Sequence, residues 1–230
     1  MKIFISFIFL FSSVLHAAVL YIGDSHSVVR SLTIEEDKRR FGNVFYDALV
    51  AQGHQVNFYA ACGSSAEDWA RGDSTTCGYT SIVDGKFTYS VEANFPALAK
   101  VYAPAKHSQV IVNLGDNMFD WKQNNGKREA NFSQSMLNVN INAFFAKLPA
   151  MTSEQCTWIG PTYHVEGTNY RKSNAAVDQL YRSLGKLLAD KCRLIDSRTL
   201  VIAREPNDGL HHSFADGQLW ATSVLKLLDL

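Results

Sequence analysis

The segment Val19-Leu20-Tyr21-Ile22-Gly23-Asp24-Ser25 decides the expected fold of this chain. Four apolar residues lead directly into a Gly-Asp-Ser turn, which is the pattern of a buried strand with a serine at its carboxyl end. In open α/β sheets, ligands bind at that end of the strands, so Ser25 would lie where a reactive side chain is useful. Gly-Asp-Ser alone is common turn chemistry, and the interpretation therefore depends on the rest of the chain.

Further strands and helices alternate along the chain. Strand-like segments at 56–60, 109–114, 156–160 and 193–195 alternate with amphipathic segments at 41–49, 132–144, 177–188 and 219–228. This alternation predicts a three-layer α/β/α domain with a parallel sheet. Between these elements we expect a loop over 62–78, a small hairpin around Asp84-Gly85 that projects from the main sheet, and a short helix over 94–102.

Residues 1–18 have the pattern of a secretory signal peptide. Lys2 provides a charged start, residues 3–15 are mostly apolar, and Ala17-Ala18 offers small residues for cleavage. A membrane anchor is the alternative, but a spanning helix needs about 20 apolar residues and would have to use those of the first strand. We therefore expect a secreted or periplasmic protein without stable membrane insertion, in which residues 19–230 form one domain.

Composition limits the classes of partner. The chain has 230 residues, a formal net charge of zero and 47% hydrophobic residues, which suits one domain with a full core. The longest basic run is Lys38-Arg39-Arg40, so the sequence argues against a nucleic-acid partner. The oligomeric state stays open.

Four cysteines suit an exported protein with two disulfides. Three pairings are available, and we favour Cys62 with Cys77, which closes one loop, and Cys156 with Cys192, which ties the starts of two strands. The spacing of the cysteines is not that of a zinc site, and no metal is expected.

Ester hydrolysis needs a nucleophile, a base, a group that orients the base, and donors for the oxyanion. Ser25 would attack, His211 would take its proton, and Asp208 would orient the His211 ring from the same turn. The backbone amides of Ser25 and Gly63 and the side-chain amide of Asn117 would form the oxyanion hole. Gly63 and Asn117 have an alternative role as ordinary turn residues.

Four sequence blocks resemble those of the SGNH hydrolases, also called the GDSL esterase/lipase superfamily. They are Gly23-Asp24-Ser25, Gly63, Gly115-Asp116-Asn117 and Asp208-Gly209-Leu210-His211, in that order. The resemblance implies a flavodoxin-like sheet of about five parallel strands, no cofactor, and the roles given above. His26 and Met118 depart from the family pattern, which often has an apolar residue and Asp at these positions, so the substrate is left open.

Residues near the blocks are expected to contact the substrate: Asp24, His26, Trp69 and His164. Trp69 would stack on a sugar ring from a loop, with ordinary packing as the alternative, and His212 would be an exposed neighbour. The sequence thus predicts a serine esterase for a small acyl ester or an acylated glycan, with acetyl esters on carbohydrate or cell-wall polysaccharide favoured. A lipase, lysophospholipase or thioesterase of the same fold, and a non-catalytic glycan-binding protein, are the alternatives.

Overall fold

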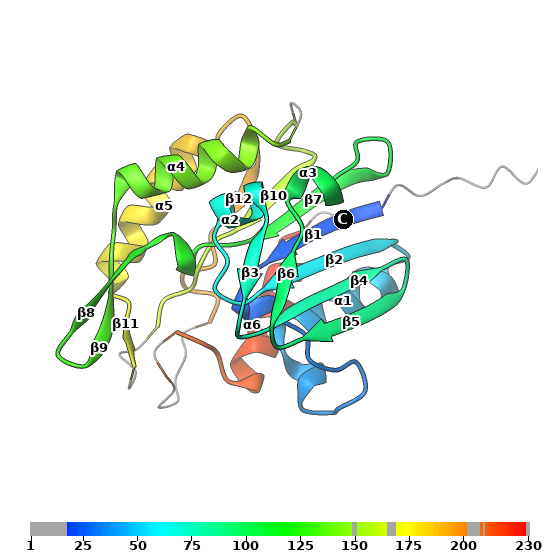
Figure 1. Ribbon diagram of the computed structural model, residues 1–230, viewed down its shortest axis with the longest axis horizontal. Coiled ribbons are helices and arrows are strands. Elements are labelled where there is room, and N and C mark those ends of the chain that lie inside the picture. The colour runs from blue at the N-terminus through cyan, green and yellow to red at the C-terminus, as the bar shows by residue number, and fades with distance from the viewer. Residues whose placement is uncertain (1–17, 149–150, 165–168, 202–207, 209, 229–230) are drawn as a thin grey trace, which may run out of the picture.

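A seven-stranded sheet forms the centre of the protein, with strand order β12-β10-β7-β1-β2-β4-β5 (Figure 1). The computed structural model describes residues 18–148, 151–164, 169–201, 208 and 210–228. The expected signal peptide lies outside these residues except for Ala18, which is buried as the first residue of β1. The first strand therefore begins one position before the expected domain boundary.

Five strands of the sheet run parallel, which confirms the expected fold class. They are β1 (Ala18–Gly23), β2 (Val56–Ala61), β7 (His107–Asn113), β10 (Cys156–Ile159) and β12 (Arg193–Ile195). β1 pairs with β2 on one side and with β7 on the other. This arrangement is the doubly wound order of flavodoxin-like sheets, and its switch point lies between β1 and β7.

The expected hairpin belongs to the main sheet, so its placement as a separate projection was wrong. β4 (Tyr79–Val83) and β5 (Lys86–Ser90) are antiparallel to each other, and β4 is antiparallel to β2. Asp84 and Gly85 connect them with φ values of 49° and 76°, as a two-residue hairpin turn requires. Ile82 is fully buried opposite Phe58, and this packing keeps the hairpin on the sheet.

Helices cover both faces of the sheet, giving the expected three layers (Figure 1). α1 (Phe41–Ala51) and α6 (Phe214–Leu225) pack against each other on one face. The other face carries α2 (Ala66–Arg71), α3 (Leu98–Val101), α4 (Gln134–Phe145) and α5 (Asn174–Leu188). Side chains of β1 alternate between two core clusters: Leu20 and Ile22 belong to one, Val19 and Tyr21 to the other.

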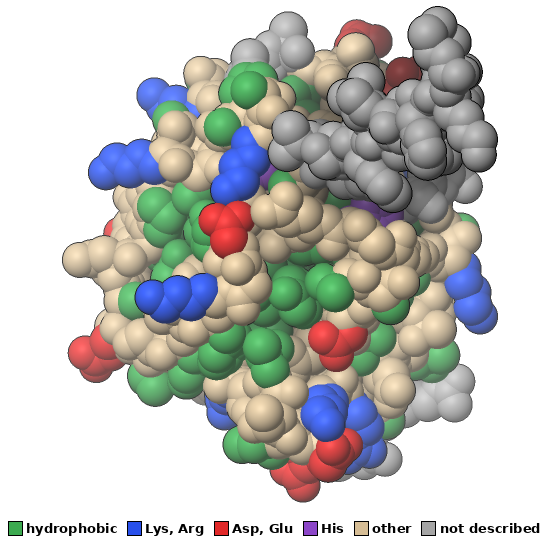
Figure 2. All heavy atoms as spheres, turned by 90° about the vertical axis from the view of Figure 1, so that its right-hand side faces the viewer, with side chains coloured by type: hydrophobic (Ala, Val, Ile, Leu, Met, Phe, Trp, Pro, Cys, Tyr) green, Lys and Arg blue, Asp and Glu red, His purple; other side chains and the backbone are tan. Residues whose placement is uncertain are grey.

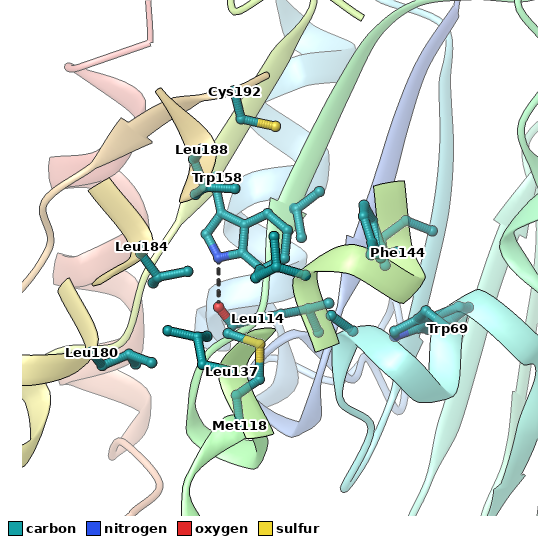
Figure 3. Packing of buried hydrophobic residues seen from close by; sticks show 14 of the residues in the cluster. Trp69, Leu114, Met118, Leu137, Phe144, Trp158, Leu180, Leu184, Leu188 and Cys192 are labelled. Atoms are coloured by element: carbon teal, nitrogen blue, oxygen red, sulfur yellow. Dashed lines mark hydrogen bonds between the residues drawn. The ribbon is translucent and has the colours of Figure 1, made fainter. Parts of the chain in front are cut away.

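Trp158 of β10 fills the core on the face of α4 and α5 (Figure 3). It is fully buried, and its indole nitrogen donates to the carbonyl oxygen of Leu114 at 2.9 Å. The contact satisfies the one polar group of a large apolar side chain. Leucines of α5 and residues of α4 surround it, with Leu137, Phe144, Leu180, Leu184 and Leu188 labelled in the figure.

Smaller elements lie in the connections. β3 (Asp73–Thr75) pairs with β6 (Ala93–Phe95), and β9 (Lys127–Asn131) pairs with β8 (Asp120–Asn124) and β11 (Tyr170–Arg171). Three short 3-10 turns are η1 (Ser25–Ser27), η2 (Asp37–Arg39) and η3 (Asp116–Met118). The expected loop over 62–78 thus contains α2 and β3. The expected helix over 94–102 is shorter than predicted, because its first residues belong to β6 and only α3 is helical.

Both disulfides have the favoured pairing, Cys62 with Cys77 and Cys156 with Cys192. None of the helices in the described part of the chain is long and apolar enough to cross a membrane. The face seen in Figure 2 carries Lys and Arg as well as Asp and Glu side chains, scattered among neutral and apolar ones. The charges on this face are therefore mixed in sign and do not form a patch of one charge.

Candidate active site

The predicted site residues meet at the carboxyl edge of the parallel strands. β1 ends at Gly23 and leads through Asp24 into η1, which carries Ser25. A Cβ atom at residue 23 would run into the side chain of Ser27, so the sharp turn into η1 needs a glycine. β7 leads in the same way into η3, and His211 lies three residues before α6.

A continuous hydrogen-bond chain joins Ser25, His211 and Asp208. His211 Nε2 lies 3.0 Å from Ser25 Oγ, and His211 Nδ1 lies 2.6 Å from Asp208 Oδ2. The other carboxylate oxygen of Asp208 accepts the backbone amides of Leu210 at 2.9 Å and His211 at 2.8 Å. When Nδ1 donates to the carboxylate, Nε2 of the neutral ring accepts, and it can take the proton of the serine hydroxyl.

Asp208 keeps its charge in this arrangement. Burial raises the pKa of its carboxyl, but the hydrogen bonds from the ring and backbone of His211 outweigh burial and lower the pKa to about 2. The ionised carboxylate holds the ring of His211 in one tautomer and would stabilise its positive charge after proton transfer.

Ser25 and His211 line a pocket of about 330 Å³. Its walls come from the segment after β1, from α1 and from α6, and they include Arg30, Arg40 and Phe214. The volume is at the small end of ligand pockets in proteins.

The ring of His26 is not free, because it pairs with a buried carboxylate. Its Nε2 lies 2.8 Å from Asp116 Oδ2, and Lys172 Nζ lies 2.6 Å from Asp116 Oδ1. The three side chains are 4%, 3% and 0% exposed respectively. His26 also lines the pocket, but its polar edge is engaged by Asp116. This buried group, His26 with Asp116 and Lys172, is named the second-layer group below.

The charges of the second-layer group support one another. Burial raises the pKa of Asp116, but the charge of Lys172 and the hydrogen bond from His26 outweigh burial and hold the pKa well below its usual range. Burial lowers the pKa of His26, but Asp116 and the charge of Asp24 outweigh burial and raise it. For Asp24, burial outweighs the charge of His26 and the hydrogen bond from its backbone amide, and it raises the pKa to about 6.

Two further histidine rings lie near His26. The rings of His164 and His212 are 4.5 Å apart, and both contact the Thr162 hydroxyl, at 3.3 and 2.9 Å. Burial lowers the pKa of both, so both rings are neutral near pH 7. His212 lines the pocket and is only partly accessible, which corrects its expected place as an exposed neighbour. In the described ranges, no three His, Cys, Asp or Glu side chains are arranged to hold a metal ion.

Three of the expected substrate contacts are buried away from the pocket. Trp69 lies in α2, is fully buried, and donates its indole hydrogen to Ser64 Oγ at 2.9 Å. Asp24 is 2% exposed and accepts the backbone amide of His26 at 3.1 Å. His164 is 6% exposed. None of these three lines the pocket, and their contact with substrate stays a prediction.

The expected oxyanion donors lie on adjoining turns. Gly63 has a φ of 80°, which favours glycine. It lines a smaller neighbouring pocket, and the Cys62–Cys77 disulfide lines both pockets. The side-chain amide of Asn117 donates to the carbonyl oxygen of Ser64 at 3.1 Å, which joins the third sequence block to the second. Their role as oxyanion donors stays a prediction.

Sequence reasoning missed Lys172, Arg30 and Phe214. Lys172 reaches its carboxylate partner across 56 positions of sequence, and no local pattern marks such a contact. Arg30 follows the serine by only five positions, so its nearness to Ser25 in sequence was a usable signal.

Comparison with known proteins supports the fold. No family model matches the chain. Protein BcsX of Komagataeibacter xylinus is 23% identical over 214 residues, which cover 90% of this chain and 75% of that protein.

Among solved structures, a carbohydrate acetylesterase family member from Sinorhizobium meliloti superposes with a TM-score of 0.53 at 17% identity, over 92% of this chain and 96% of that chain. Est24, a carbohydrate acetylesterase from the same organism, superposes with a TM-score of 0.52 at 13% identity, over 92% of this chain and 100% of the Est24 chain. A Clostridium thermocellum family 3 carbohydrate esterase superposes with a TM-score of 0.50 at 12% identity, over 91% of this chain and 94% of that chain. The α/β/α architecture of this chain is therefore the SGNH hydrolase fold.

Proposed function

We propose that this protein is an exported serine esterase that removes short acyl groups, above all acetyl groups, from carbohydrate. The observation that carries the proposal is the hydrogen-bond chain in which His211 Nε2 lies 3.0 Å from Ser25 Oγ and His211 Nδ1 lies 2.6 Å from Asp208 Oδ2. A serine hydroxyl with a histidine and an ionised carboxylate in this order is an activated nucleophile.

The reaction would proceed through an acyl-enzyme. Ser25 Oγ attacks the ester carbonyl carbon while His211 Nε2 takes the hydroxyl proton. The alcohol then leaves with that proton, and water, deprotonated by the same nitrogen, releases the acyl group as a carboxylic acid and restores Ser25. The backbone amides of Ser25 and Gly63 and the side-chain amide of Asn117 would donate to the oxyanion. Loss of one such donor typically lowers the rate by about 100- to 1,000-fold.

Two observations favour a short acyl group and a sugar, and a third favours export. The pocket has a volume of about 330 Å³ and contains arginine and histidine side chains beside its apolar ones. Such a pocket suits a small polar ligand better than a long acyl chain. Two of the structures with the same fold are described as carbohydrate acetylesterases. Two disulfides suit an oxidising compartment outside the cytoplasm, in agreement with the expected signal peptide.

The test combines turnover with labelling of the nucleophile. Purified protein is assayed on 4-nitrophenyl esters of increasing acyl length and on acetylated xylan, and a fluorophosphonate label is located by peptide mapping. We expect labelling of Ser25, fastest turnover on acetyl esters, and loss of both in Ser25→Ala. Ser74→Ala, a change at an exposed serine of β3, serves as the matched control and should behave as wild type.

Two results would contradict this function. Label on a serine other than Ser25, or equal turnover in Ser25→Ala, would remove the proposed nucleophile. A preference for long acyl chains would leave a serine esterase but would favour the lipase and thioesterase alternatives over a carbohydrate substrate.

A further inference from the structure

The pocket beside Ser25 has cationic side chains in its walls and no acidic ones among its described lining residues. Arg30 and Arg40 line it together with Ser25 and His211. A pocket whose formal charges have a single sign attracts ligands of the opposite sign and raises their local concentration. The proposed hydrolysis of a neutral acetyl ester does not require this property.

The two arginines differ in what they contact. Arg40 Nε donates to Asp37 Oδ1 at 2.6 Å, and its guanidinium lies over the Phe214 ring, 4.8 Å from the centroid. Arg40 is therefore held in place and its charge is balanced. Arg30 is exposed, and within the described ranges no carboxylate lies in ion-pair distance of it. Arg30 is therefore an exposed arginine of the pocket wall.

We propose that Arg30 binds a carboxylate of the substrate, so that the esterase acts on acylated glycans that contain acidic sugars. A guanidinium binds a planar carboxylate through two parallel hydrogen bonds, and one unpaired guanidinium matches one such charge. Arg40 is already paired with Asp37, so among the described lining residues Arg30 is the guanidinium left to bind the ligand. This inference rests on the proposed function and adds the substrate class to it.

Two small substrates that differ only in the carboxylate test the inference. They are methyl glucoside and methyl glucuronide carrying an acetyl group at the same hydroxyl. We expect wild type to have the higher kcat/KM on the glucuronide, and Arg30→Gln to lower the ratio of the two kcat/KM values about tenfold, mainly through KM. Added salt should lower the wild-type ratio, because screening weakens an exposed ion pair.

Arg182→Gln is the matched control. Arg182 of α5 is also exposed and has the same charge, but it does not line the pocket. This variant should keep the wild-type ratio, since a general effect of net charge would change both variants alike. An equal loss in both variants would contradict the role of Arg30.

A binding experiment separates this inference from the esterase activity. Calorimetry with methyl glucuronide on Ser25→Ala protein needs no turnover, and the affinity should fall when Arg30→Gln is added. Weaker binding in the double variant supports the carboxylate site even if no ester is hydrolysed. Equal kcat/KM on both esters with equal binding in both proteins would overturn the site and leave the esterase function standing.

Discussion

His26 Nε2 lies 2.8 Å from Asp116 Oδ2, so the residue that follows the candidate nucleophile is tied directly to the turn after β7. Lys172 Nζ holds the other oxygen of the same carboxylate at 2.6 Å. Asp116 is 2% exposed, and an ionised group at such a place needs partners on both oxygens. The second-layer group therefore fixes the position of η1, and with it Ser25, relative to the neighbouring strand end.

This position predicts that His26 acts on catalysis through Ser25. His26→Ala removes the donor to Asp116 and frees the η1 turn, and a misplacement of the nucleophile by about 1 Å can lower the rate about 100-fold. We expect kcat to fall about 10- to 100-fold while KM changes little. His26→Gln keeps a side-chain donor and should recover part of kcat. Steady-state kinetics on an acetyl ester measures both values.

His54→Ala serves as the control, because His54 lies at the other end of the sheet, just before β2, and does not line the pocket. A rise in KM with unchanged kcat in His26→Ala would contradict the positioning role. It would instead support the direct substrate contact that the sequence predicted for His26.

Lys172 is predicted to stabilise the fold strongly. Its side chain is fully buried against Asp116. Lys172→Met leaves the carboxylate without its cation, and removal of one partner of a buried pair typically costs about 3–5 kcal/mol of unfolding free energy. Urea denaturation measures this loss. The double variant Lys172→Met/Asp116→Asn should recover part of it, because neither charge then remains buried.

Lys186→Met changes an exposed lysine of α5 and should leave the free energy of unfolding within about 0.5 kcal/mol of wild type. If Lys172→Met proved equally harmless, the buried pair would contribute no net stability to the protein.

Buried groups of the site are predicted to change stability with pH in opposite directions: the lowered pKa values of His164 and His212 favour folding as pH rises to 6.5, whereas Asp24 favours folding in acid. Burial raises the pKa of Asp24 to about 6 in the folded protein, so its favourable contribution is complete below its ordinary value of 3.8 and is lost as pH rises towards 6. The raised pKa of His26 likewise favours folding at low pH, and this contribution to stability is lost as pH rises above 6.5. Asp208 and Asp116 have lowered pKa values, so they favour folding above pH 3.8 and lose this contribution only in stronger acid.

Asp24→Asn tests the contribution of Asp24, because the amide side chain no longer titrates but its oxygen can still accept the backbone amide of His26. Unfolding free energies are measured at intervals from pH 4 to pH 7, and the value for wild type minus that for the variant should fall as pH rises towards 6. Asp190→Asn, at an exposed position after α5, should follow the wild-type curve. Parallel curves for Asp24→Asn and wild type would show that Asp24 does not contribute to the pH dependence of stability.

Local patterns were enough to predict the parts of the fold that depend on local order. The apolar run before Ser25 and the alternation of strands with amphipathic helices predicted the five parallel strands. The short separation of Asp208 and His211 similarly predicted that one turn holds both. Such features depend on residues close in sequence, where periodicity and turn chemistry act directly.

The remaining features depend on long-range packing or on a signal that was overlooked. Ser65 and Asp68 form a capping box at the start of α2, and this pattern could have shown that Trp69 lies on a helix and not on a loop. Nothing in the sequence around Ile82 indicated that its hairpin pairs with β2. Lys172 finds its partner only when the chain is folded, because the carboxylate of Asp116 lies far away in sequence.

Asp208 is predicted to act by setting the tautomer of His211. In Asp208→Asn, the side-chain amide can donate to His211 Nδ1, which places the ring proton on Nε2, the nitrogen 3.0 Å from Ser25 Oγ. That nitrogen then cannot accept the serine proton, and we expect kcat on an acetyl ester to fall by about 10⁴ while the thermal unfolding temperature changes little. Asp190→Asn, at an exposed carboxylate remote from the pocket, provides the comparison. A loss of less than tenfold in Asp208→Asn would mean that Asp208 does not orient the base, and the serine would then need another source of activation.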